Sequence, residues 1–205
     1  MCKFIHFIYH VIWLFVFKIK TNLSTLFFRL KLWLNNVDAG IGIRCMNRIP
    51  SLHIHHKCNG VKIGDNVLMR SNAGNCWNSH VDIIVKQNAK LHIGNNTGIS
   101  GSLIYCTKCI EIGNNVMIGG GCRIFDTNFH PLEAFRRLDP KTVNDGKSAP
   151  VIIEDNVFIG TNCIIGKGVR VGQGSVIAAG TVVVKSVPAN EIWGGNPARF
   201  IRKID

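Results

Sequence analysis

A polar, turn-rich insert between Ile124 and Val151 contains the residue best suited to acid–base chemistry. The insert opens with FDTNFHP, in which His130 precedes Pro131. An imidazole ionises near neutral pH, so it can take a proton from a hydroxyl group as that hydroxyl reacts. Because many histidines on surface loops are merely solvated, the residue type alone leaves that alternative open. Functional residues concentrate on loops held by a rigid scaffold, which favours His130.

Asp126 lies four residues before His130, at the end of the last regular strand that we expect before the insert. Its carboxylate could orient His130 or bind an acceptor hydroxyl. It could equally cap a turn, because Asp is common in turns. The residues alone leave these three roles open.

The scaffold that must hold this insert is predicted by a six-residue repeat of branched apolar residues. The repeat runs without a break through Ile153, Ile159, Ile165, Val171, Ile177 and Val183. A second small or branched residue follows each by four positions, at Val157, Cys163, Val169, Ser175, Thr181 and Val187. A period of six fits neither an α-helix nor a simple strand. It predicts stacked coils, each of which must bury its apolar face against its neighbours.

The same repeat occurs earlier in the chain. Ile93 and Ile99 are six apart, and after a one-residue slip it continues through Cys106, Ile112, Ile118 and Ile124. The expected inward partners are Thr97, Leu103, Ile110, Val116 and Cys122. The phrases IGDNV, IGNNT, IGNNV and IEDNV are near copies of one another. Their Asn residues tolerate left-handed backbone angles, which predicts a tight turn at each phrase.

From about residue 60 to 204 the chain resembles the hexapeptide-repeat acyltransferases, which fold as left-handed parallel β-helices. The segment DTNFHPL, followed by Arg136 and Arg137, resembles the DTDFHP-type segment of polysaccharide and lipopolysaccharide O-acetyltransferases. It is also similar to the GHP segment of galactoside and maltose acetyltransferases. In both groups the His before Pro is the general base, so the resemblance implies that role for His130.

The resemblance also implies acetyl-CoA as the acyl donor and direct transfer to a sugar hydroxyl. The ending GNPARFIRKI is similar to the family's G-x-P-A-[KR]-x-I-[RK]-x-I segment, although a solvated basic tail is the alternative. The implied oxyanion donor is the backbone N–H of Thr161. The implied CoA contacts are Thr161, Ala179, Lys185, Arg199 and Arg202. A covalent route through Cys163 is disfavoured, because its position in the repeat faces the interior.

The acceptor contacts are less clearly matched. Galactoside acetyltransferases carry an Asn in an earlier coil, where this chain reads GISGS, so Ser100 or Ser102 would replace it. Phe158 and Arg136 complete the expected acceptor contacts. The family implies a homotrimer with active sites between subunits. The alternatives are an amino-sugar N-acyltransferase, a serine acetyltransferase or a non-catalytic scaffold, while the acceptor sugar and the length of the acyl group stay open.

Composition narrows the class of protein further. The 205 residues carry a net charge of +12, but no nucleic-acid-binding motif accompanies it, so phosphates of a small ligand or of lipid are the expected partners. The eight cysteines include the CxxC at 106–109, which lacks a second pair at zinc spacing, and we expect no metal. Scattered single cysteines suit the reducing cytoplasm. The histidines at 53, 55 and 56 precede the regular repeat and are expected in a loop.

The first 40 residues form a separate apolar and basic segment. Residues 4–17 are almost all apolar apart from His6 and His10, and no acidic residue occurs before Asp38. The run is too short for a typical membrane span, and no cleavage site follows it. It suits a helix on the inner surface of the cytoplasmic membrane, with packing on the coil as the alternative. We therefore expect three parts: this segment at 1–40, an all-β helix at 41–190 with a loop at 125–150, and a CoA-binding tail at 191–205.

Overall fold

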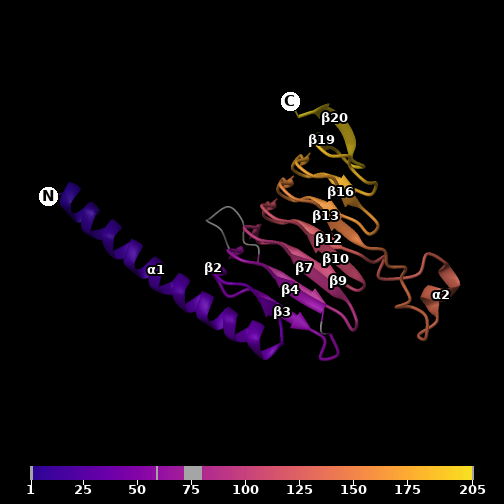
Figure 1. The fold of residues 1–205 in the computed structure, drawn as a ribbon, viewed down its shortest axis with the longest axis horizontal. Coiled ribbons are helices and arrows are strands. Elements are labelled where there is room, and N and C mark those ends of the chain that lie inside the picture. Colours follow the sequence, from indigo (N-terminus) through magenta and orange to yellow (C-terminus); the bar gives the residue numbers. More distant parts are fainter. Residues whose placement is uncertain (1, 59, 72–79, 205) are drawn as a thin grey trace.

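The computed structural model describes residues 2–58, 60–71 and 80–204; the side chains of residues 2–11 and 13, including His6 and His10, lie outside the description. Helix α1 (Cys2–Leu34) is followed by stacked coils whose strands form three parallel sheets (Figure 1). Each coil supplies one strand to each sheet, which confirms the predicted left-handed parallel β-helix. The coil begins at Asp38, earlier than expected, so His53 lies in a strand and not in a loop.

The three sheets are numbered here in the order in which the chain first enters them. Sheet 1 contains β1 (Asp38–Ala39), β4 (Gly60–Ile63), β7 (Lys90–Ile93), β10 (Cys109–Ile112), β13 (Val151–Ile153) and β16 (Arg170–Val171). Sheet 2 contains β2 (Arg44–Asn47), β5 (Leu68–Ser71), β8 (Gly98–Ser100), β11 (Met117–Ile118), β14 (Phe158–Ile159), β17 (Val176–Ile177), β19 (Glu191–Gly194) and β20 (Arg199–Lys203). Sheet 3 contains β3 (Ser51–Ile54), β6 (Asp82–Val85), β9 (Leu103–Cys106), β12 (Arg123–Phe125), β15 (Ile164–Ile165) and β18 (Val182–Val183). The chain therefore turns at three edges, which we call the 1/2, 2/3 and 3/1 edges.

The interior of the β-helix contains the residues that the six-residue repeat predicts. Every predicted inward position from Ile153 to Val187 is buried. Two of these positions are polar, and their hydroxyls are satisfied: Ser175 donates to the Pro188 carbonyl at 2.6 Å and Thr181 to the Ala178 carbonyl at 2.6 Å. Such bonds remove most of the cost of burying a hydroxyl in an apolar core.

The Asn-rich phrases form the 1/2 edge. Side-chain oxygens accept a hydrogen bond from a backbone amide of the coil before, as Asn95 does from Asp65 at 2.7 Å and Asp155 does from Asn114 at 2.7 Å. The Asn at the fourth position of each phrase adopts a positive φ, for example 56° at Asn96 and 55° at Asn115. Their side chains also bond to one another from coil to coil, at 3.3 Å between Asn96 and Asn115. The repeated phrase therefore encodes both the turn and the stacking of coils.

One predicted inward position is wrong. Leu103 was expected inside, but it is half-exposed, and Ser102 is buried in its place with 2% of its surface exposed. The Ser102 hydroxyl donates to the carbonyls of Ser100 at 2.7 Å and Gly119 at 2.9 Å, and it accepts from the Cys122 amide at 3.1 Å. The 2/3 edge is one residue shorter in this coil, which shifts the alternation of the following strand.

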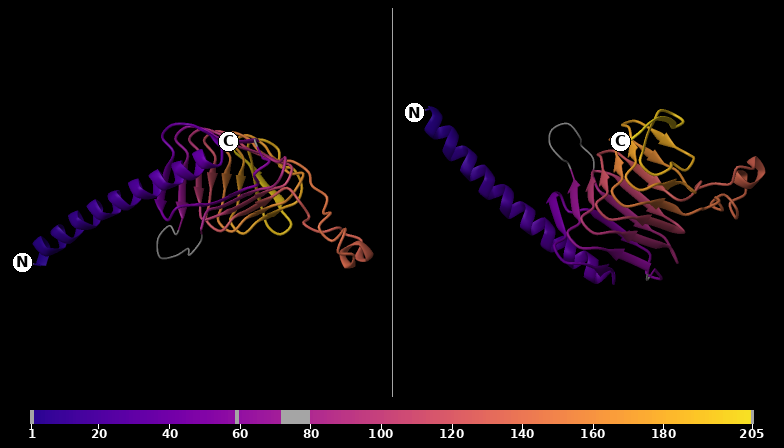
Figure 2. Two further views of the ribbon diagram at one scale, coloured as in Figure 1. Left: turned by 90° about the horizontal axis from the view of Figure 1, so that it is seen from below. Right: turned by 45° about the horizontal axis from the view of Figure 1, so that its top comes forward.

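Helix α1 covers the open end of the first coil and then runs outward from it (Figure 2). Phe28 and Leu32 are fully buried against the coil. The Thr25 hydroxyl accepts from the Cys45 amide of β2 at 2.9 Å, and Ser24 donates to the Asn47 carbonyl at 3.3 Å. The helix thereby supplies partners to an edge strand that has no preceding coil. Within the described residues, no helix is long and apolar enough to cross a membrane.

Candidate active site

The insert leaves the β-helix at the 3/1 edge, between β12 and β13. It contains the short helix α2 (Ala134–Leu138) and projects on the side of the molecule opposite α1 (Figure 1). The two ends of the insert are joined by an isolated antiparallel bridge between Thr127 and Ser148 and by a bond from the Ala149 amide to the Asp126 carbonyl at 2.9 Å. The Thr107 hydroxyl of the coil below bonds to Ser148 at 2.8 Å. The base of the insert is therefore fixed to the rigid coil.

His130 is exposed on this insert, and its ring is oriented by one hydrogen bond. Its Nδ1 lies 2.6 Å from the Val143 carbonyl oxygen. A carbonyl only accepts hydrogen bonds, so Nδ1 must carry the proton. In the neutral imidazole Nε2 then has a free lone pair. The orientation leaves the unprotonated nitrogen available to accept a proton, as a general base requires.

The backbone next to His130 is held in an unusual conformation. Phe129 has a φ of 63°, which is uncommon for a bulky residue. Its ring packs against Tyr105, with centroids 4.9 Å apart, and against Phe125 at 5.4 Å. Its amide donates to the Thr127 hydroxyl at 3.0 Å. Such strain persists only where surrounding contacts fix it, and these contacts place the following residue, His130.

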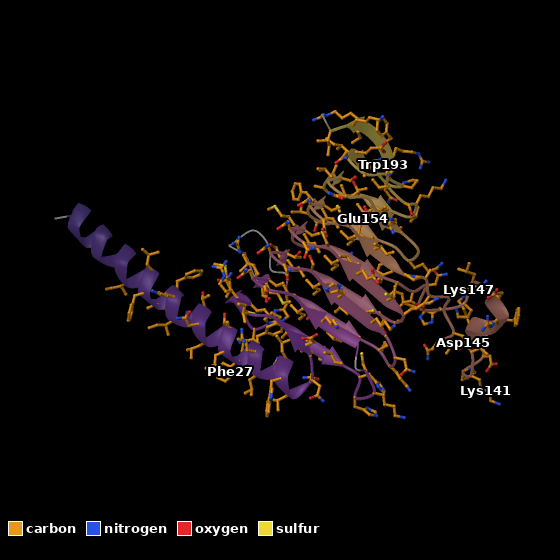
Figure 3. The ribbon with its side chains drawn as sticks, viewed as in Figure 1. Phe27, Lys141, Asp145, Lys147, Glu154 and Trp193 are labelled. Carbon is orange, nitrogen blue, oxygen red and sulfur yellow. The ribbon has the colours of Figure 1, made fainter. Side chains whose placement is uncertain are left out.

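Arg136 at the tip of the insert pairs with acidic residues of the insert itself. Its guanidinium lies 3.8 Å from the Glu133 carboxylate and 3.4 Å from that of Asp145. Figure 3 shows Asp145 beside Lys141 and Lys147 in this projecting segment. These ion pairs stiffen the tip of the insert. The expected contact of Arg136 with the acceptor stays a prediction.

Asp126 has the turn-capping role among the three that the sequence left open. Its side chain is fully buried and accepts bonds from the amides of Thr107 at 2.8 Å, Lys108 at 2.6 Å and Cys109 at 2.8 Å. The Thr107 hydroxyl adds a fourth bond at 2.7 Å. None of the bonds found in the described part of the chain joins Asp126 to His130. The described contacts of Asp126 are therefore those of a turn cap, and its catalytic role stays a prediction.

The two serines expected to contact an acceptor differ in their placement. Ser102 is wrong for this role, because its hydroxyl is buried and committed to the 2/3 edge. Ser100 is half-exposed and lines a shallow groove on the outer face of sheet 2. Phe158, 44% exposed, lines the same groove together with Arg70 and Met117. The structure thus brings together Ser100 and Phe158.

The residues expected to bind CoA are spread over different edges of one chain. Thr161 and Ala179 follow β14 and β17 and lie on successive coils of the 2/3 edge, where β20 and Arg199 begin nearby. The close stacking there requires Gly160, because a Cβ at this position would lie 2.6 Å from the Ala179 nitrogen. The amides of Thr161 and Ala179 have no acceptor among the described residues. At the 1/2 edge, by contrast, the corresponding backbone amides donate to Asp and Asn side chains.

Lys185 and Arg202 lie apart from that group. Lys185 follows β18 and is exposed at the 3/1 edge, the edge that also carries the His130 insert. Arg202 is exposed on β20, whose antiparallel pairing with β19 carries it toward the 1/2 edge. A single chain therefore does not assemble His130 with the 2/3-edge amides into one site.

Among the described cysteines of the coil, Cys109 is half-exposed and the others are buried in the interior. Cys163 is fully buried, in agreement with its predicted inward position, and its thiol donates to the Ala178 carbonyl at 3.1 Å. Burial and the neighbouring Asp126 carboxylate raise the pKa of the Cys106 thiol. Neither sulfur is placed to attack a substrate. Among the described residues, no group of His, Cys, Asp and Glu side chains could hold a metal ion.

Sequence reasoning missed the partners of His130. Val143 lies in the irregular part of the insert, where no periodicity marks which carbonyl faces the ring. The packing of Phe129 was also missed, although a signal existed. Tyr105 and Phe125 occupy paired outward positions on adjacent strands, an arrangement in which aromatic side chains commonly pack on one another.

Comparison with known proteins agrees with this architecture. Residues 150–185 match the family model described as the hexapeptide repeat of succinyl-transferase. The chain is a hexapeptide-repeat protein of the left-handed β-helix class. The sequences and structures that it resembles include several acetyltransferases.

Three of these similar proteins give the extent of the likeness. A Schizosaccharomyces pombe protein that is provisionally named an acetyltransferase is 46% identical over 98 residues, which are 47% of this chain and 44% of that protein. The hexapeptide-repeat acetyltransferase of Vibrio cholerae complexed with acetyl coenzyme A is 35% identical, covering 56% of this chain and 61% of that one, with a TM-score of 0.51. The polySia-specific acetyltransferase NeuO is 26% identical, covering 82% and 79%, with a TM-score of 0.52. The match spans about half the length of the curated relatives.

Proposed function

We propose that the protein is an acetyl-CoA-dependent O-acetyltransferase that acts on a hydroxyl of a sugar or of a surface-polysaccharide precursor. The observation that carries the proposal is the orientation of the exposed His130, whose Nδ1 bonds to the Val143 carbonyl and so leaves Nε2 as the nitrogen that can accept a proton. The likeness to an acetyltransferase solved with acetyl coenzyme A supports the donor. The likeness to NeuO, which acts on polySia, supports a glycan acceptor.

The proposed reaction is a direct transfer. The acceptor hydroxyl gives its proton to Nε2 of His130, and its oxygen attacks the thioester carbonyl. The carbon–sulfur bond then breaks, and the imidazolium returns the proton to the departing CoA sulfur. The amide of Thr161, which has no acceptor among the described residues, would donate to the oxyanion that forms during attack. The amide of Ala179 would bond to the donor's pantetheine arm, and Arg199 would face its phosphates.

Because the proposed catalytic groups lie on different edges of one chain, the proposed reaction requires more than one subunit. His130 projects from the 3/1 edge, whereas Thr161 and Ala179 lie on the 2/3 edge. We infer that the insert of one copy reaches the 2/3 edge of a neighbour in a homotrimer. Lys185, on the 3/1 edge, would join the site from the same copy as His130.

The proposed place of this reaction is the cytoplasm. All six cysteines for which a state is described are free thiols, as a reducing compartment would keep them.

The test is transfer of acetyl groups from acetyl-CoA to a panel of nucleotide sugars, lipid-linked sugars and free glycans. For the best acceptor, His130→Ala should lower kcat by about 100-fold or more, since general bases typically contribute that much. The matched control is His92→Ala, an exposed histidine on the outer face of sheet 1. A purified His130→Ala protein that keeps wild-type kcat would refute the assignment.

A further inference from the structure

Helix α1 carries a second apolar surface, which faces away from the β-helix. It consists of Ile12, Phe15, Ile19, Leu23, Leu26, Leu30 and Trp33, which we call the outer stripe. Each of these side chains is between 44% and 72% exposed. Their spacing of three and four residues places all seven on one side of the helix. Figure 3 shows Phe27, at the border of the stripe, on the outer side of α1.

The outer stripe is distinct from the surface that packs on the coil. The packed side consists of Phe17, Ser24, Phe28 and Leu32, which are buried or half-buried. At 100° per residue, the centres of the two sides lie about 180° apart around the helix axis. The exposure of the stripe is therefore not a by-product of loose packing on the first coil.

Two rows of cations flank the outer stripe. Lys18 and Arg29 lie along one border, and Lys20 and Lys31 lie along the other, each about 100° from the centre of the stripe. No acidic residue occurs before Asp38. Long basic side chains beside an apolar face can extend along it and place their charges at lipid phosphates. This distribution is typical of helices that lie in the surface of an anionic bilayer.

We propose that α1 docks lengthwise on an anionic lipid bilayer. The outer stripe enters the boundary between headgroups and acyl chains, and the four cations contact lipid phosphates. With the stripe in this boundary and the cations at the phosphates, α1 would lie along the surface of the bilayer. The helix projects from the coil (Figure 2), which keeps the stripe accessible. This inference does not depend on the proposed reaction.

The charge pattern favours lipid over a second copy of the chain as the occupant. Helices that pair through an apolar stripe commonly carry both signs of charge along its borders, so that opposite charges meet. Here both borders are basic, and two copies placed face to face would bring like charges together. An anionic bilayer supplies the opposite charge along the whole helix.

The experiment uses the full chain and vesicles of phosphatidylcholine, with and without phosphatidylglycerol. We expect binding to the anionic vesicles that weakens with added salt. Leu26→Ser with Leu30→Ser should weaken it by about tenfold or more, because each exposed leucine loses its apolar contact with lipid. Lys20→Gln with Lys31→Gln should weaken it by roughly 30-fold, at about fivefold for each cation near an anionic surface.

The matched control is Leu132→Ser with Leu138→Ser, two exposed leucines of the insert, which should bind vesicles as the wild type does. Equal binding of the wild type to both kinds of vesicle would overturn the proposal. Wild-type binding by either α1 variant would do so too. A smaller particle mass of the Leu26/Leu30 variant in lipid-free solution would show that the stripe joins copies of the chain.

Discussion

Replacement of Asp126 by Asn tests whether this carboxylate is part of the scaffold or part of the chemistry. The two carboxylate oxygens accept four hydrogen bonds from the turn at 107–109, two at each oxygen. Asn keeps one acceptor oxygen and places an NH₂ group against the two remaining donors. Each buried donor left without a partner costs about 1–3 kcal/mol, so the expected loss of unfolding free energy is about 2–5 kcal/mol.

The assay is thermal unfolding followed by circular dichroism at fixed protein concentration. At about 2–4 °C per kcal/mol for a chain of this size, Asp126→Asn should lower the midpoint by about 5–15 °C. The matched control is Asp155→Asn on the 1/2 edge. Its Oδ1 accepts from the Asn114 backbone amide at 2.7 Å, and both carboxylate oxygens accept from the Asn114 Nδ2 at 3.3 Å. Asn95 and Asn114 already accept the equivalent backbone bond in other coils. The control should change the midpoint by about 2 °C or less.

A second measurement separates the two roles. Below the unfolding transition, the Asp126→Asn protein should keep the wild-type shape of its pH–rate profile, because Asp126 contacts the turn and not His130. An unchanged midpoint together with a large fall in kcat would refute the reasoning, since the carboxylate would then act on the reaction and not on the fold.

Two further predictions concern the insert and the core. Phe129→Ala should lower kcat by about tenfold with little change in KM for acetyl-CoA, since the ring contacts that place His130 are lost. The control is Phe135→Ala, which removes a side chain of α2 that is 72% exposed. A wild-type kcat for Phe129→Ala would contradict the positioning role. Burial raises the pKa of Cys45 from 9.0 to about 12. The thiol ionises first in the unfolded chain, so its contribution is intact below pH 9 and falls by about 1.4 kcal/mol per pH unit above it. Urea unfolding at several pH values should therefore show a shallower loss for Cys45→Ala, and parallel curves would exclude the effect.

The regular part of the fold could be predicted because its constraint is periodic. From Ile153 to Val187 each coil buries residues at fixed spacing, so the sequence pattern and the burial agree position by position. The burial of Ser102 in place of Leu103 could not be predicted. It depends on the 2/3 edge being one residue shorter in this coil, and the apolar Leu103 suits the expected inward position equally well. The same limit applied to the first coils, where the repeat is too irregular to reveal that β1 begins at Asp38.

The candidate site was predictable only in part. The interruption of the repeat and the residue type indicated His130, but the carbonyl that orients it comes from 13 residues further along an irregular loop. For Asp126, three roles suited the sequence, and only the turn that folds around its carboxylate distinguishes them. For α1, the sequence offered a membrane-surface helix and a helix packed on the coil as alternatives. The structure shows one side of the helix packed on the coil and another side exposed.

The distribution of the proposed site over the 3/1 and 2/3 edges has a consequence for assembly. A contact that joins one edge of a subunit to a different edge of the next is heterologous, and such contacts close into a ring when the rotation allows it. In a closed ring the number of complete sites equals the number of subunits, whereas an open pair has one complete site and two unmatched halves. Ring closure would then complete the remaining sites, and a dissociated subunit would keep its fold and have no complete site.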